Sequence, residues 1–229
     1  MTFADRVNRF NRKLRLSVRL PEGIRVMNPF RENPEILETS GLFYKSFFDD
    51  IYPRRLILGI NPGRLGAGAT GIPFTDSKRL SAICNIRLES VSTHEPSSVF
   101  VYDLIHRYGG VGKFYRDYFI GALCPLGFVR RSEKGNWVNC NYYDTAELYE
   151  AVRPFILHTL REQIDFGVDR GTCFVLGKKN AIYLKRINQE GKFFDHLVVF
   201  DHPRYIEQYK AKQREKYISE YLNLLKSGR

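Results

Sequence analysis

The chain has 229 residues, of which 43% are hydrophobic, and carries a formal net charge of +11. This length and apolar content are enough for one domain with a substantial core, so we treat residues 1–229 as a single domain. No apolar run approaches the length of a membrane span, and the excess of positive charge favours a polyanionic partner.

Residues 1–31 are predicted to form a basic helical extension. Phe3, Val7, Phe10 and Leu14 recur at helical spacing, and the segment holds eight Arg or Lys residues against two acidic ones. Two interpretations stay open for its basic face. It clamps the phosphates of a nucleic acid, or it is the solvated face of an ordinary surface helix.

Helical patterns and short apolar runs alternate along the rest of the chain. We predict helices at residues 33–50, 97–108, 144–164, from 177 onward and at 205–225, and strands at 54–60, 118–124, 172–176 and 197–200. The basic stretch 130–137 reads as a hairpin or a protruding loop. Nearly all-apolar strands that alternate with helices indicate a parallel sheet covered on both faces, an α/β fold.

The four cysteines are interpreted as buried free thiols. Cys84, Cys124, Cys140 and Cys173 lie too far apart for the close spacing of a metal-ligand set. We therefore expect no metal and no cofactor.

Two of the predicted strands end in a polar residue followed by proline. The first leads into Asn61-Pro62-Gly63 and the second into His202-Pro203-Arg204. Carboxyl ends of parallel strands meet at one edge of the sheet, which is where open α/β folds bind ligands. We expect Asn61 and His202 to face one cavity.

A glycine-rich stretch at residues 66–71 matches G-x-G-x-x-G and could indicate a dinucleotide-binding turn. Its context is against this interpretation, because five residues separate it from the strand and Ile72-Pro73-Phe74 follows its third glycine. We interpret the glycines as allowing a planar ligand to approach the backbone, with Phe74 as a stacking surface.

The pattern G-x-N-P-G followed by T-G-x-P-F resembles motif one of the uracil-DNA glycosylase superfamily, and is most similar to its single-strand-selective monofunctional branch. Cys124-Pro125-Leu126 at a strand end, Thr145-Ala146-Glu147-Leu148 at a helix start and His202-Pro203-Arg204 follow in the order of that branch. The resemblance covers residues 54–204. It implies a three-layer α/β/α sandwich with a central four-stranded parallel sheet. It also implies an enzyme of base excision repair that flips a damaged base into a pocket.

The resemblance also implies roles for individual residues. Asn61 would orient the attacking water, His202 would stabilise the negative charge of the departing base, Gly63 would admit the base and Phe74 would stack on it. The other residues expected to contact the base are Gly59, Ile60, Ala122, Leu123, Cys124 and Asn141. No lysine flanks either motif to form a Schiff base, so we expect a monofunctional hydrolase.

Contacts with DNA are expected from basic residues at the same sheet edge. Lys178 and Lys179 open a helix, where backbone N–H groups also attract phosphate. The remaining candidates are Arg64, Arg130, Arg131, Arg204 and Tyr205. We expect a monomer that is cytoplasmic and associated with the bacterial nucleoid.

One position departs from the family pattern. Ala122 occupies the place of an asparagine that reads uracil in the related branch, and alanine cannot bond the base edge. Backbone groups near Leu123, or the amide of Asn139, Asn141 or Asn180, could replace it. Uracil stays the favoured substrate, with deaminated purines and oxidised pyrimidines as alternatives. A non-catalytic protein that binds damaged DNA and a small-molecule nucleotide enzyme are the rival functions.

Overall fold

A four-stranded parallel sheet forms the centre of the computed structural model, which describes residues 1–227. Its strands are β2 (Arg54–Gly59), β3 (Tyr118–Ala122), β6 (Val168–Leu176) and β7 (His196–Phe200). They are arranged in the order β3-β2-β6-β7. Pairing of Gly59 with Ala122 brings the carboxyl ends of β2 and β3 level with each other.

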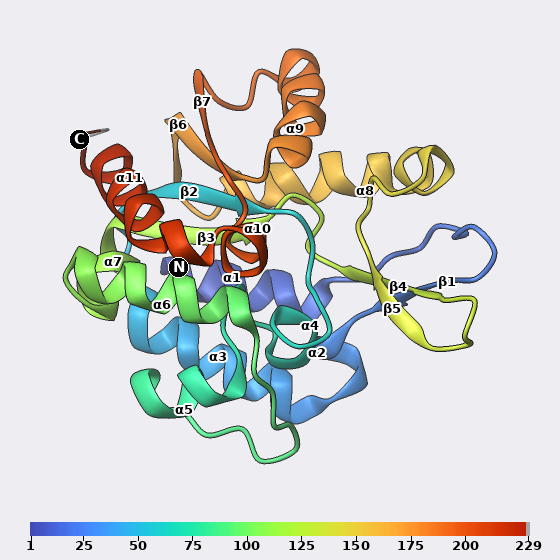
Figure 1. Cartoon of the computed structure of the whole chain (residues 1–229), viewed down its shortest axis with the longest axis horizontal. Coiled ribbons are helices and arrows are strands. Elements are labelled where there is room, and N and C mark those ends of the chain that lie inside the picture. The colour runs from blue at the N-terminus through green and yellow to red at the C-terminus, as the bar shows by residue number, and fades with distance from the viewer. Residues whose placement is uncertain (228–229) are drawn as a thin grey trace.

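Helices cover both faces of this sheet, as the sequence predicted, in a three-layer α/β/α arrangement (Figure 1). On one face, the ring of Phe200 stacks on Phe174 and on Tyr221 of α11 (Arg214–Ser227). Tyr221 in turn contacts the ring of Phe100 in α6 (Pro96–Tyr108). On the other face, α8 (Ala146–Ile164) and α9 (Lys178–Gly191) pack against β6.

The remaining elements surround this core. They are α1 (Phe3–Lys13), α2 (Pro29–Glu32), α3 (Pro34–Phe48), α4 (Ala67–Thr70), α5 (Ser77–Cys84), α7 (Val111–Asp117), α10 (Pro203–Tyr209) and a 3-10 turn at Ala211–Gln213. The predicted hairpin is confirmed as β4 (Gly127–Arg131) and β5 (Trp137–Cys140). With β1 (Ile24–Met27) it forms a second, antiparallel sheet that projects to the right of Figure 1.

Most predicted boundaries agree with the structure to within a few residues, and two differ. The helix predicted at 205–225 is divided at residues 210–213 into α10 and α11. The strand predicted at 172–176 begins earlier, at Val168, because a register shift between Arg55 and Leu56 lets β6 pair with β2 over a longer stretch. All four cysteines are buried free thiols, as expected.

The N-terminal helix is confirmed, and it packs into the core against α3, β3 and the segment that follows α8. A capping box of Thr2 and Asp5 starts α1. The ring of Phe3 then lies 5.2 Å from the ring of Phe119 in β3, and Phe10 meets Phe166 at 5.3 Å. The apolar face of α1 therefore belongs to the structure that supports the sheet. Among helices within residues 1–227, none is long and apolar enough to cross a membrane.

Arg54 is a fully buried cation at the amino end of β2. Its guanidinium donates to both carboxylate oxygens of Asp50 at 2.7 and 2.8 Å and to the carbonyl of Tyr115 at 2.7 Å. The rings of Phe3 and Phe48 each lie 4.8 Å from its Cζ atom. This side chain therefore joins α1, α3 and α7 to the start of the central strand.

We expect Asp50→Ala to lower the free energy of unfolding by about 2–3 kcal/mol, because it leaves the buried guanidinium of Arg54 without its carboxylate. Asp49→Ala is the matched control. It removes an ion pair with Lys45 in which both side chains are about half exposed, and we expect a change below about 1 kcal/mol. Urea unfolding of both variants gives the comparison, and equal losses would contradict the role of Arg54.

Candidate active site

A cavity of about 350 Å³ opens at the carboxyl ends of the central strands. Its lining includes the ends of β2 and β3, the loop that follows β2, the start of α10 and part of α1. Asn61, Phe74 and His202 all line it, and the rings of Phe74 and His202 have centroids 5.6 Å apart. The two polar strand ends therefore face one shared space, as the sequence predicted.

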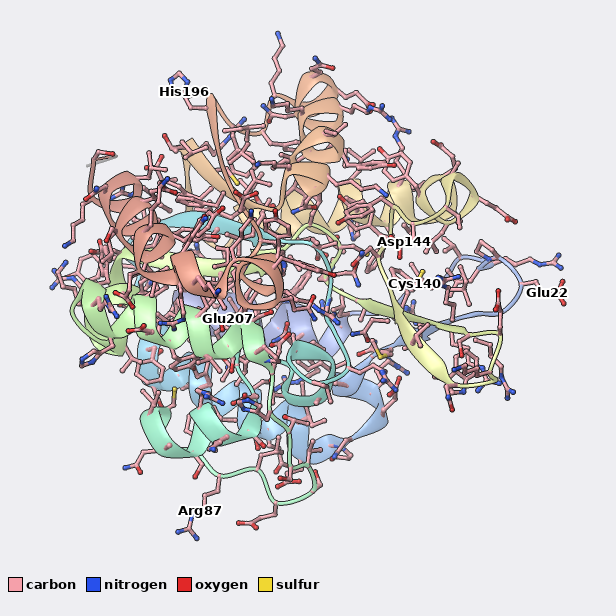
Figure 2. The ribbon with its side chains drawn as sticks, viewed as in Figure 1. Glu22, Arg87, Cys140, Asp144, His196 and Glu207 are labelled. Carbon is pink, nitrogen blue, oxygen red and sulfur yellow. The ribbon has the colours of Figure 1, made fainter. Side chains whose placement is uncertain are left out.

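The Asn61 side chain is fixed by hydrogen bonds to the segment that follows β5. Its Nδ2 donates to the carbonyl of Cys140 at 3.2 Å, and its Oδ1 accepts from the backbone N–H of Tyr142 at 3.1 Å. Cys140 and Asp144 mark this segment, between β5 and α8, in Figure 2. An amide oxygen has two lone pairs, so Oδ1 can still accept one bond from a molecule in the cavity.

Phe74 is held over the end of β2 by its loop. Its backbone has a φ of 52°, a left-handed conformation that a bulky residue rarely adopts. The hydroxyl of Thr70 fixes this turn by donating to the carbonyl of Thr75 at 2.6 Å and accepting from the N–H of Ile72 at 3.2 Å. Gly59 makes room for the ring, because a Cβ atom there would lie only 3.0 Å from Phe74 Cε2.

The side chain of His202 caps the start of α10 through a hydrogen bond, and this bond determines which ring nitrogen carries the proton in the neutral form. Its Nδ1 accepts from the backbone N–H of Arg204 at 3.1 Å, so in the neutral ring the proton is on Nε2. Burial, and secondarily the charge of Arg204, lowers the pKa of His202 to about 4. At neutral pH the cavity therefore contains an uncharged Nε2–H donor.

Sequence reasoning missed Glu95, which lies at the cavity beside the glycine-rich loop. Its Oε2 is buried without a hydrogen-bond partner, and a Cβ atom on Gly66 would overlap it at 2.1 Å. Burial, and secondarily the charge of Asp76, raises the pKa of Glu95 to about 7. The glycine at 66 is needed for this close packing, which gives the G-x-G-x-x-G stretch a role without a dinucleotide.

Two further polar residues of the cavity, Asn11 and Gln163, were also missed. Asn11 interrupts the apolar stripe of α1, and that interruption was the available signal. Gln163 is the penultimate residue of α8, and the sequence carries no comparable signal for it.

The other residues predicted to contact the base divide into two groups. Gly59, Ile60, Gly63, Ala122, Asn139 and Asn141 line the cavity. Leu123 and Cys124 are fully buried outside its lining, and their N–H groups donate to the carbonyls of Gly59 and Ile60. Asn180 is also fully buried away from the cavity.

The predicted DNA-contacting residues are spread around the site. Arg204 lines the cavity and is exposed, and Tyr205 lies next to it in α10. Lys178 pairs with Asp201 at 3.1 Å, while the ammonium of Lys179 lies 4.7 Å from the ring centre of Tyr143. The backbone N–H of Arg64 donates to Asn139 in the loop after β2. Arg130 and Arg131 are in β4 of the second sheet, not in a loop at the edge of the central one.

Comparison with known proteins agrees with this geometry. The sequence model described as the Uracil DNA glycosylase superfamily matches residues 46–226. The solved structure of wild-type SMUG2 from Pedobacter heparinus is 45% identical, with a TM-score of 0.96, covering 99% of this chain and 98% of that one. Among the curated proteins, none matches. The chain belongs to the uracil DNA glycosylase superfamily, and its activity is that of a uracil-DNA glycosylase, a hydrolase of base excision repair.

Gly59→Ala tests how Phe74 is placed. The added methyl group would push the ring out of position, and we expect the rate of uracil release to fall on the order of 10- to 100-fold. Gly41→Ala in α3 is the control, because its Cβ would meet nothing closer than 3.8 Å, and we expect an unchanged rate. Single-turnover excision measures both. A wild-type rate for Gly59→Ala would remove Phe74 from the site.

Glu95→Gln tests the burial of the carboxyl group. The pKa of Glu95 is raised from 4.5 to about 7, so the native state binds this proton more tightly than the unfolded state and loses stability as pH rises through that interval. Relative to wild type, we expect the free energy of unfolding of the variant to be higher by on the order of 1 kcal/mol at about pH 8 and almost unchanged at about pH 5.

The exposed Glu133, in the hairpin, provides the control for this comparison. Glu133→Gln should change the free energy of unfolding little at either pH. Denaturant unfolding at the two pH values measures the effect. An equal gain for Glu95→Gln at both would show that its carboxyl group is not held as a buried acid.

Proposed function

We propose that this cavity receives a uracil flipped out of DNA and that Asn61 and His202 carry out its hydrolytic release. The observation that carries this proposal is the placement of Phe74 and His202, which are far apart in the sequence, with ring centroids 5.6 Å apart in the cavity that Asn61 also lines. A base stacked on Phe74 in this cavity would have a hydrogen-bond donor and an oriented acceptor beside it.

His202 stabilises the leaving group. As the N-glycosidic bond breaks, its electron pair moves onto the uracil ring and negative charge builds on O2. A neutral Nε2–H aimed at that oxygen acts as an oxyanion-hole donor, and it needs no proton transfer to do so. The bond from Arg204 N–H to Nδ1 keeps the Nε2–H tautomer in place.

Asn61 orients the water that completes the reaction. An amide cannot remove a proton, but the free lone pair of Oδ1 can accept a hydrogen bond from the water while its oxygen approaches C1′ of the sugar. The C1′–N1 bond breaks, the C1′–O bond forms, one water proton goes to solvent, and the uracil anion takes up a proton after release. No cavity-lining residue within 1–227 is a lysine, in keeping with a monofunctional hydrolase.

In this proposal, the protein binds DNA mainly through the attraction between basic side chains and DNA phosphates. Arg204 lines the cavity and Tyr205 follows it, exposed, in α10, so both would brace the strand around the flipped nucleotide. Arg64, Lys178 and Lys179 would contact the flanking phosphates, which give affinity and little sequence preference. The protein acts as a monomer in the bacterial cytoplasm, associated with the nucleoid.

Asn61→Ala and His202→Ala test the assignment. Loss of one oxyanion-hole donor typically slows a reaction by about 100- to 1000-fold, and we expect single-turnover uracil release to fall on that order for His202→Ala. Asn61→Ala loses the group that orients the water, and we expect a fall on the order of 100-fold. Binding to a uracil-containing oligonucleotide should change little. Because Asn61→Ala also removes two structural bonds, its thermal unfolding is measured at the assay pH.

His196→Ala is the control for these variants. His196 is exposed at the opposite end of β7 from the cavity (Figure 2), so its loss should leave the rate unchanged. Wild-type rates in both site variants would overturn the assigned roles. Binding without base release by the wild-type protein would indicate a damage-binding protein instead.

A further inference from the structure

Ala122 lines the cavity but has no side-chain group that could form a hydrogen bond with a base. It pairs with Gly59 in the parallel register, so its side chain projects from the same face of the sheet as the position that Phe74 covers. A methyl group there can pack against a base but cannot bond to it. Uracil presents O4 as an acceptor and N3–H as a donor, and a pocket that leaves these unpaired in a dry site binds it poorly.

Four amides near this position are already committed elsewhere. Gln163 donates through Nε2 to the carbonyl of Ala122 at 3.1 Å. Asn139 accepts from the N–H of Arg64 and is exposed on β5. Asn141 bonds to Asp144, and fully buried Asn180 donates to the carbonyl of Gly59. None of these four has a buried, unpartnered side-chain donor.

Asn11 has the property that the other four lack. Its side chain is 5% exposed and lines the cavity, and its Nδ2 is buried with no hydrogen-bond partner. Burying an amide donor without a partner costs on the order of 1–3 kcal/mol, so a group held in this way is expected to have a partner at some stage. Because this buried amide lines the cavity, a molecule bound there can supply the missing partner.

The position of α1 explains how Asn11 reaches the site. Phe3 at the start of the helix contacts Phe48 and Phe119, while Asn11, two turns later, lies level with the strand ends that form the cavity. The helix thus packs against β3, the strand that carries Ala122. Residue 11 also lies outside residues 46–226, so the family match assigns it no role.

We propose that Asn11 recognises the flipped base, supplying from the N-terminal helix the amide that Ala122 lacks. With His202 at O2, the Nδ2 of Asn11 donates to O4 of uracil and its Oδ1 accepts from N3–H. Cytosine presents a donor in place of O4 and an acceptor at N3, so the same amide cannot pair with it in this orientation. This inference rests on the proposed function of the cavity and adds the residue that selects the base.

Asn11→Ala and Asn8→Ala form the test, in the full chain. Asn8 is on the same helix and donates to the carbonyl of Gly41, but it does not line the cavity. Single-turnover release of uracil from an oligonucleotide is measured for both, together with thermal unfolding. We expect Asn11→Ala to slow release on the order of 10- to 100-fold and Asn8→Ala to leave it within about threefold of wild type.

The double variant Asn11→Ala/Ala122→Asn separates base recognition from folding. It places an amide at the position that faces the cavity from β3, and we expect at least a tenfold recovery over Asn11→Ala. The inference is overturned by a near wild-type rate in Asn11→Ala, by equal losses in the Asn8 and Asn11 variants, or by a double variant no faster than Asn11→Ala. Failure of the proposed function would appear differently, as wild-type rates in Asn61→Ala and His202→Ala.

Discussion

A chain of buried hydrogen bonds fixes the active site at the end of the central strand. Asn180 in α9 donates to the carbonyl of Gly59 at 3.1 Å and accepts from the hydroxyl of Tyr142 at 2.8 Å. The backbone N–H of Tyr142 then donates to Asn61, whose own amide donates to Cys140. The end of β2, the segment before α8 and the start of α9 are thereby joined, so Asn61 has one orientation before any substrate arrives.

This pre-organisation matters because hydrolysis of a glycosidic bond demands electrostatic stabilisation of a charge that exists only briefly. Groups already aimed at that charge do not have to reorient as it forms, and in a water-poor cavity each interaction is stronger than in solution. His202 is held through its bond from Arg204, Phe74 is held in a left-handed turn, and Gly59 provides the space for its ring. The protein's contribution to rate, in this account, is the fixed placement of neutral donors and acceptors.

The sequence was sufficient to predict those site residues that lie immediately after the carboxyl end of a strand. Asn61 and His202 each come after an apolar run and before a proline, and parallel strands bring such ends together. Asn11 and Glu95 could not be placed in this way. Asn11 enters the cavity because α1 packs against β3 and the segment after α8, and Glu95 because the loop before α6 folds over Gly66. Both placements depend on long-range packing that no local pattern encodes.

The fold likewise has parts that local sequence patterns predict and parts that depend on long-range pairing. Nearly all-apolar runs predicted the four central strands, because only a sheet buried on both faces favours them. The longer β6 depended instead on its pairing register with β2, and no local pattern predicted the interruption of the terminal helix at residues 210–213. Asn180 was a candidate base reader because its amide could replace the one missing at Ala122, and the structure instead shows it as the buried support of Asn61 through Tyr142.

Nitrogen NMR of the labelled protein measures directly whether His202 is a neutral ring with its proton on Nε2. We predict the Nε2–H tautomer throughout the range from about pH 5.5 to about pH 8, because the pKa of His202 is lowered to about 4. A protonation midpoint near pH 6.5, or a proton on Nδ1, would contradict the account.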